Sequence, residues 1–369
     1  MVRRLLLLNG LAVIGAVLYH ASGWGFTAMF WWTDRYAAVT VPDFSQMGSI
    51  PYYGLRLVVQ LIIFSIPAFL FVSGFFTAFA TGRDQLTVSW KVIGTRIKNL
   101  AIPYLLWTGA IIVTNVLAGQ LYTPARLFQE IVFGKAAPPY YYVPLIIQLY
   151  LLSPFLIRFA RTHVRALLII AAILQFSVQT IKYVELLGVN LPSSNLLQIF
   201  TASWFFPGHI FWYVFGITVK FNLPSMKKWL DKYKWVFLGL LIVLIPIGMF
   251  EWEVILHASE VGWLAHQRTL INELYSLMFL LCFLAFEWFP IPPSKRINAL
   301  GPKSFGVYLA HSPVLQYASR GMYHLTPWIL GVQILFQPIL LILGIGVPLL
   351  LMKIVEHSPA RRFYAYIFG

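Results

Sequence analysis

Windows of about twenty apolar residues recur along this 369-residue chain far more often than in a water-soluble protein. They fall at ten places, namely residues 5–24, 58–81, 100–119, 140–158, 165–184, 198–219, 235–252, 269–288, 304–323 and 328–352. A window of that length crosses the hydrocarbon core of a bilayer as an α-helix, which satisfies its own backbone groups. The sequence therefore predicts an all-α, polytopic membrane helical bundle of about ten transmembrane helices.

The composition supports this prediction. Hydrophobic residues make up 59% of the chain and charged residues 11%, and the mean hydropathy is +0.76. The first window continues past Ala21 into Trp24 without a small-x-small cleavage site, which predicts a retained span and not a cleaved signal peptide. Because no soluble stretch separates the windows, we expect residues 1–369 to form a single integral-membrane domain. The one cysteine, Cys282, allows no intrachain disulfide.

The formal net charge of +15 is explained by where the cations fall relative to the windows. If the N-terminus is cytoplasmic, 20 of the 27 Lys and Arg residues, including Arg83 and the cluster from Lys227 to Lys234, lie in inner segments. The other 7 lie outside or near outer helix ends, and they are Arg35, Arg56, Arg126, Lys135, Lys182, Arg268 and Arg320. This bias follows the positive-inside rule and predicts cytoplasmic termini in a multi-pass protein of the cell's inner (plasma) membrane. The cations then contact anionic membrane lipids, and nothing supports a nucleic-acid partner.

The first window ends on an ionisable side chain. Residues 5–20 read LLLLNGLAVIGAVLYH, so His20 is carried into a segment that spans lipid. This costly placement marks His20 as a candidate for proton exchange, although a histidine that satisfies a carbonyl between packed helices gives the same pattern. Asn9, eleven residues earlier, shares the same helical face about 16 Å away along the axis. It faces a cavity or bonds to a neighbouring helix.

Two further blocks combine polar residues with helix ends or close packing. The second window contains IPAFLFVSGFF, where Pro67 permits a kink and Ser73 with Gly74 permits close approach of a ligand or of another helix. Arg96 and Lys98 stand at the inner mouth of the third window. They fit either topology-determining cations or a phosphate-binding site at a helix N-terminus.

Four more polar positions lie in apolar windows. Late in the chain, LGPKSFGVYLAHSPVL places Tyr308 and His311 three residues apart on one helical face. Gln148 lies in an apolar stretch of the fourth window, and His209 is as compatible with packing as with chemistry.

Several standard site motifs are missing from the sequence. There is no HExxH, and His20, His209 and His311 have no acidic companions at ligand spacing, so we expect no metal site. Neither GxSxG nor a Walker loop is present. The acidic residues Glu273 and Glu287 lie near window ends. The windows therefore contain few carboxylates that could relay protons or sodium ions in a coupled transporter.

Six blocks, in this order, resemble those of the acyltransferase-3 family of ten-span membrane acyltransferases. They are LNGLAVIGAVLYH, PAFLFVSGFF, TRIKNLAIPYLLW, YYYVPLIIQLYLLSP, WYVFGI and LGPKSFGVYLAHSPVL, and together they span nearly the whole chain. The resemblance implies that an acyl group, usually acetyl, passes from cytoplasmic acyl-coenzyme A to a hydroxyl of a glycan or other cell-surface acceptor.

The resemblance also implies roles by position. His20 matches the catalytic histidine, which acts as general base on the acceptor hydroxyl or carries the acyl group itself. The residues expected to serve the donor, acyl-coenzyme A, are Arg96, Lys98, Ser73, Asn9, Tyr308 and His311.

Two departures from the family pattern leave other functions open. Asn9 stands where the family has a first-helix arginine, and Asn99 where its basic block has a second arginine. Lys98, Arg3 or Arg4 compensates for the lost charge, or the donor is unusual. Otherwise the protein is a non-catalytic transporter or flippase-like protein for a glycan, lipid or acyl carrier. Another histidine-dependent membrane acyltransferase fold fits less well, because the histidine lies on the first span.

Overall fold

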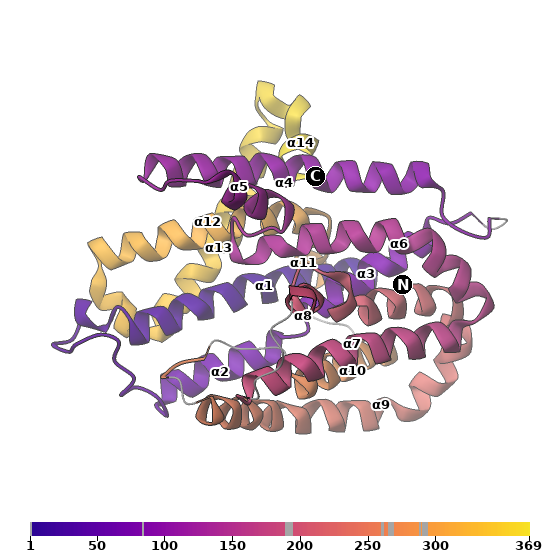
Figure 1. Cartoon of the computed structure of the whole chain (residues 1–369), viewed down its shortest axis with the longest axis horizontal. Helices are drawn as coiled ribbons and strands as arrows, with labels where there is room; N and C mark the ends of the chain where they lie inside the picture. Colours follow the sequence, from indigo (N-terminus) through magenta and orange to yellow (C-terminus); the bar gives the residue numbers. More distant parts are fainter. Residues whose placement is uncertain are drawn as a thin grey trace.

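The computed structural model describes residues 2–82, 85–188, 195–259, 262–264, 269–287, 289 and 294–369. Within these residues the chain is helical and contains no strand, and the long helices run roughly along one direction (Figure 1). Two of the cations whose side of the membrane was predicted, Arg83 inside and Arg268 outside, lie beyond the described residues.

Seven segments of the described chain are helical, long and apolar enough to cross a membrane. They are α1 (Val2–Phe30), the pair α2 (Ile50–Ile62) and α3 (Ser65–Phe79), α4 (Trp90–Leu117), η2 (Pro138–Tyr141) with α6 (Tyr142–Thr162), α7 (Val164–Leu186), α9 (Ile210–Ala258) and α13 (Gln333–Glu356). Two more predicted spans correspond to α10 (Leu270–Ala285), which is shorter, and α12 (Ser304–Leu325), which is more polar. The all-α membrane bundle is therefore confirmed, while the number of ten crossings stays a prediction.

Short helices complete the chain. They are α5 (Pro124–Val132), α8 (Asn195–Thr201), α11 (Ser294–Leu300) and α14 (Tyr364–Phe368), with the 3₁₀ turns η1 (Thr33–Arg35), η3 (Phe206–Gly208), η4 (Gly301–Lys303), η5 (Pro327–Gly331) and η6 (Pro359–Phe363).

Helix α1 lies at the centre of the bundle, packed against α2, α3, α11, α12 and α13. Two of its glycines permit this close packing. A Cβ at Gly10 would lie 2.2 Å from the carbonyl oxygen of Ile297, and one at Gly15 would lie 2.2 Å from Ser65 Oγ. Helices in a bilayer associate through such close contacts between small residues, because lipid supplies no hydrophobic driving force. The position of α1 determines where His20 lies.

Arg4 joins the start of α1 to the end of α10. Its guanidinium donates hydrogen bonds to the carbonyl oxygens of Phe283 at 3.1 Å and Glu287 at 2.7 Å, and to that of Phe286. The last carbonyls of a helix have no partner within the helix, and a cation at this end is favoured by the helix dipole. Arg4 therefore acts as a C-terminal cap, so it does not supply the charge that Asn9 lacks.

Helix α9 folds back on itself although it is continuous over 49 residues. A Cβ at Gly74 would touch the carbonyl of Tyr213, and one at Gly248 would touch the side chain of Gln60. Tyr213 and Gly248 would be about 50 Å apart in a straight helix, whereas Gln60 and Gly74 are separated by only about 20 Å of helix. The two halves of α9 therefore run beside the same helix pair, as its bend at the right of Figure 1 shows.

Some predicted boundaries are wrong. The window 198–219 is not one helix, because Pro207 and Gly208 separate α8 from α9 with the turn η3. The break in the second window lies at Ile63 and Phe64, and Pro67 falls in the first turn of α3, where proline is tolerated. The two predicted spans at 198–219 and 235–252 are joined by continuous helix through Pro224, not by a loop.

One acidic side chain, Glu273, joins three helices. Glu273 accepts hydrogen bonds from Gln175 Nε2 at 2.8 Å, Gln179 Nε2 at 3.2 Å and Trp212 Nε1 at 2.9 Å, which connects α10 to α7 and α9. Polar side chains inside a bilayer are tolerated when they are satisfied in this way. Glu273 therefore has a structural role.

Arg56, one of the cations assigned outside, is buried. Its guanidinium forms an ion pair with Glu253 at 3.1 Å and lies 3.5 Å from the ring centroid of Trp252. The exposed fraction of Arg56 is 1%, so this charge belongs to the contact between α2 and α9 and not to the outer surface.

Three of the segments expected at the inner face lie at one end of the molecule. In Figure 1 the α3–α4 connection, the α6–α7 turn and the bend of α9 lie at the right, and the α1–α2 connection lies at the left. The right-hand segments include the Lys227–Lys234 cluster. This arrangement is the one that the positive-inside rule requires.

Candidate functional site

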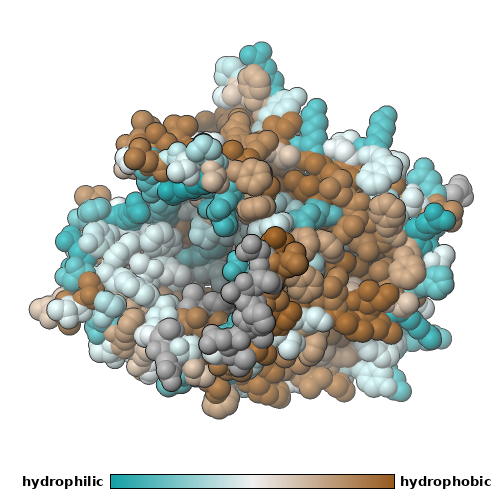
Figure 2. Space-filling model, viewed as in Figure 1, coloured by the Kyte–Doolittle hydropathy of each residue, from teal (hydrophilic) through white to brown (hydrophobic). Residues whose placement is uncertain are grey.

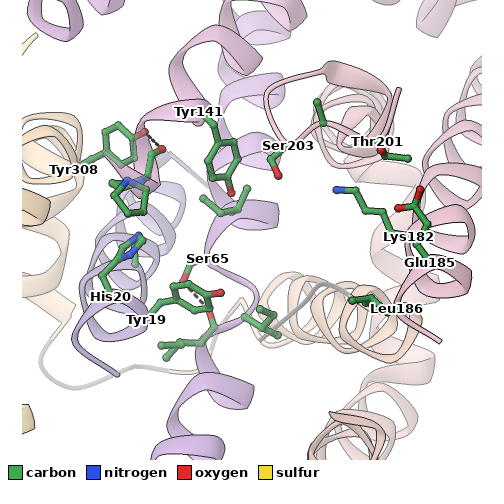
Figure 3. Close-up of a pocket in the computed structure, with 17 residues that line it drawn as sticks. Tyr19, His20, Ser65, Tyr141, Lys182, Glu185, Leu186, Thr201, Ser203 and Tyr308 are labelled. Carbon is green, nitrogen blue, oxygen red and sulfur yellow. Dashed lines mark hydrogen bonds between the residues drawn. The ribbon is translucent and has the colours of Figure 1, made fainter. Parts of the chain in front are cut away.

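A cavity of about 650 Å³ lies beside His20. It is enclosed by α1, the bend between α2 and α3, η2, the end of α7, the segment 201–203 and α12 (Figure 3). Figure 2 shows a hollow with hydrophilic walls in this region, near α5 and α8, on a face that is otherwise largely hydrophobic. His20 reaches this cavity from the interior of a helix, because α1 continues unbroken to Phe30.

His20 contacts two aromatic rings. The Tyr19 ring lies edge-on to it at 5.4 Å between centroids, and the His311 ring is 5.2 Å away. His311 Nδ1 is 2.7 Å from the carbonyl oxygen of Tyr308. A carbonyl only accepts, so neutral His311 carries its proton on Nδ1 and leaves Nε2 as an acceptor.

The Nε2 atom of His311 is buried and has no hydrogen-bond partner among the described residues. An unsatisfied buried acceptor costs about 1–3 kcal/mol, so its persistence beside a candidate catalytic group calls for a functional reason. The structure thus places His311 against both His20 and Tyr308, and its role toward the donor stays a prediction.

The wall opposite His20 is polar. Lys182 and Glu185 from the end of α7 face the cavity there, with Ser203 and Thr201 between that wall and the η2 side (Figure 3). Such groups donate and accept hydrogen bonds, so the cavity suits a hydroxylated molecule better than an acyl chain alone.

Gln148 and His209 hold the segment that carries Ser203. Gln148 Nε2 donates to the carbonyl oxygen of Trp204 at 2.8 Å, and His209 Nε2 lies 3.1 Å from the carbonyl oxygen of Ser203. A carbonyl oxygen accepts, so His209 Nε2 carries the proton in this contact. The two polar residues that the sequence left unexplained therefore position one wall of the cavity.

A second, more open hollow of about 1040 Å³ adjoins the first. The two share Pro138, Tyr141, Ala202 and Ser203 as lining residues. The hollow also contains Phe133 and Trp204, whose rings are stacked with centroids 4.4 Å apart. A ligand in the His20 cavity can therefore extend over an aromatic surface.

A third cavity, of about 130 Å³, brings together three residues that the sequence assigned to the donor. Asn9, Ser73 and Tyr308 line it from three different helices, with Tyr142 and Tyr150 from α6. The Asn9 Oδ1 atom is buried there without a hydrogen-bond partner among the described residues. The polar groups of this otherwise apolar cavity are hydroxyls and an amide, so it suits a neutral chain with a few polar groups better than a phosphate.

The two basic residues of the sequence motif differ in position. Arg96 donates to the carbonyl oxygen of Phe76 at 3.0 Å, and its guanidinium lies 5.7 Å from the ring centroid of Tyr150, a residue of the small cavity. Lys98 and Asn99 are exposed and line none of the three cavities. Arg96 is therefore beside the small cavity, while the role of Lys98 stays a prediction.

The sequence reasoning missed most of the polar residues in the His20 cavity. Ser65, Tyr141, Lys182, Glu185 and Ser203 all line it. A signal existed only for Lys182 and Glu185, which are a charged pair three residues apart near the end of an apolar window. No group of three or more His, Cys, Asp or Glu residues in the described part of the chain is arranged to hold a metal.

A family profile described as an acyltransferase domain matches residues 4–353. The chain belongs to this acyltransferase-3 family. The resemblance read from the six sequence blocks is therefore confirmed, and the chain is a membrane protein of an acyltransferase family. No curated protein matches the chain, and no solved structure does.

Proposed function

We propose that this protein is a membrane O-acyltransferase that moves an acyl group, acetyl in the simplest case, from cytoplasmic acyl-coenzyme A to a hydroxyl of a glycan or other cell-surface acceptor. One observation carries the proposal. Asn9 and Ser73 line the small cavity, His20 lines the large one, and Tyr308 lines both, so the predicted donor residues and the predicted catalytic residue lie in series.

The donor enters from the end of the bundle where α1 begins. Arg96, beside the small cavity, holds a phosphate of the coenzyme through charge-assisted hydrogen bonds. The pantetheine arm then lies against Asn9 and Ser73, whose neutral groups pair with its amides. This division of labour explains why an asparagine suffices at position 9.

His20 acts on the acceptor. It takes the proton of the acceptor hydroxyl as that oxygen attacks the thioester carbonyl, a C–O bond forms, the C–S bond breaks, and the proton leaves with the coenzyme as a thiol. In the covalent variant, His20 itself first receives the acyl group. His311 Nε2, the unsatisfied acceptor next to His20, accepts the second ring N–H of His20 and so stabilises its protonated form.

The acceptor occupies the large cavity and the adjoining hollow. Lys182, Glu185 and Ser203 bond its polar groups, and the Phe133 and Trp204 rings pack against a further part of it. Partners of the protein are thus membrane lipids, acyl-coenzyme A and a hydroxyl-bearing acceptor.

The alternative is a non-catalytic transporter or flippase-like protein, which the uncharged Asn9 and the exposed, uncharged Asn99 favour. Titration of acetyl-coenzyme A against detergent-solubilised protein at two salt concentrations separates the two. We expect Arg96→Ala to weaken binding roughly ten- to a hundredfold, because charge-assisted hydrogen bonds to a phosphate are lost.

Arg165→Ala is the matched control, since Arg165 is an exposed cation assigned to the same membrane face that lines none of the three cavities. It should leave coenzyme binding unchanged. Absence of binding at millimolar coenzyme, or equal binding in the two variants, favours the transporter.

A further inference from the structure

Tyr308 separates the two cavities that the proposed reaction connects. Among the described residues, it alone lines both the small cavity of Asn9 and Ser73 and the large cavity of His20. Its exposed fraction is 3%, and its hydroxyl donates to the carbonyl oxygen of Pro139, which also lines the large cavity (Figure 3). The hydrogen bond therefore crosses the gap between α12 and η2 at the point where the cavities meet.

Aromatic packing completes this barrier. The Phe305 ring is stacked on the Tyr308 ring at 6.0 Å between centroids, and the Tyr142 ring meets it edge-on at 5.7 Å. A narrow apolar constriction of this kind excludes water and ions. A membrane protein with a cavity on each side needs such a barrier, because an open passage would let ions and protons leak.

We propose that Tyr308 and the Pro139 carbonyl form a closed gate between the donor cavity and the His20 cavity, and that the pantetheine arm of the donor must part them to bring its thioester to His20. The role of the donor arm rests on the proposed function, whereas the existence of the gate does not. The segment opposite Tyr308 is the four-residue 3₁₀ turn η2, which leads directly into α6.

A neighbouring residue provides a matched control. Tyr140 donates from its hydroxyl to the carbonyl oxygen of Leu309 at 2.8 Å, which links η2 and α12 in the opposite sense. Tyr140 is buried like Tyr308 but lines neither of the two cavities. Y308F and Y140F therefore remove equivalent hydrogen bonds between the same elements, and only Y308F touches the gate.

The test measures passage directly. Ser203 lines the large cavity, so a chain with Ser203→Cys and Cys282→Ala is placed in sealed vesicles and treated from the side where α1 begins with a small, membrane-impermeant, charged maleimide, whose thioether a thiol does not reverse. An impermeant thiol on the other side removes leaked reagent. Reagent applied from that other side, without the thiol, confirms that the cysteine is reactive in every variant.

We expect the introduced cysteine to be labelled about two- to tenfold faster in the Y308F variant than in the parent chain. Loss of one neutral hydrogen bond shifts the equilibrium between the closed and the open gate by about that factor. Y140F should label at the parent rate. Equal rates for Y308F and the parent, or equal acceleration by Y140F, would overturn the gate.

Acetyl-coenzyme A on the side where α1 begins should slow the labelling of Y308F, because its arm occupies the passage. If the coenzyme neither protects the cysteine nor binds in the titration above, the proposed function fails, while the comparison of Y308F with Y140F still decides the gate.

Discussion

At the scale of residues, two ionisable side chains of α1, Arg4 and His20, have different surroundings. Arg4 donates to the terminal carbonyls of α10, so its charge is used within the fold. His20 borders a cavity of about 650 Å³ and contacts His311, whose Nε2 is unsatisfied. An ionisable group inside the membrane is available for chemistry when its charge and hydrogen bonds are not used in helix packing.

Replacing His20 tests this difference. We expect His20→Ala to insert and fold normally but to lose acyl transfer roughly 10²–10⁴-fold, the usual contribution of a general base. His20→Gln keeps a polar side chain of similar size without the base and should be as inactive. Transfer of acetyl from radiolabelled acetyl-coenzyme A to membrane glycans is the measurement, and normal turnover in both variants would leave His20 a packing residue.

The candidate residues were predictable only where their local sequence carried the signal. A polar residue in an apolar window is visible in sequence, and Asn9, Ser73 and Tyr308 were expected near the donor and do line one cavity. The cap formed by Arg4 was not predictable, because its partner carbonyls lie about 280 positions further along the chain. In the sequence, Ser203 looks like an ordinary loop residue. Its place in the cavity depends on the contacts that Gln148 and His209 make with its segment in the folded protein.

At the scale of elements, hydropathy located the apolar helices but not how they join. The basic segment 220–234 separates two apolar windows and was expected as a loop, yet it is helical. Lysine, leucine and methionine favour helix, and helical residues leave no backbone group unpaired. Pro224 allows the helix to bend, and contacts with α2 and α3 determine the direction of the bend, which local sequence does not encode.

The glycines of α9 give a test of this packing. A Cβ at Gly216 would lie 2.0 Å from the carbonyl oxygen of Phe71, so Gly216→Ala forces α9 away from α3. We expect a loss of about 1–3 kcal/mol of stability, typical of overpacking, seen as a lower midpoint in thermal unfolding in detergent. Gly239→Ala is the control in the same helix, because no atom lies within 4 Å of its added Cβ, and it should be neutral or slightly stabilising. A similar loss in both variants would contradict the close contact.

At the scale of the whole molecule, the two ends of the chain both lie close to the start of α12. Gly301, just before α12, packs on the carbonyl of Leu6, and Gly369 packs against Phe305 in the first turn of α12. The beginnings of α1 and α12 and the last residue therefore lie near one another. Asn9 of α1 and Phe305 of α12 also line the small cavity, so the proposed donor site lies in the same region.

This arrangement gives a prediction about orientation in the membrane. With 20 of the 27 cations assigned to the inner side, the end that carries Gly369 should face the cytoplasm, and Gln120, beyond the far end of α4, should face outside. A fluorescent protein that matures only in the cytoplasm should be bright after Gly369 and dark when inserted at Gln120, and an alkaline phosphatase should give the reverse. Because Trp107 Nε1 donates to the carbonyl oxygen of Ile367 at 2.9 Å, the fusion after Gly369 needs a flexible linker that leaves α14 in place. If both positions report the same side, the membrane orientation is wrong, and so is a donor site supplied from the cytoplasm.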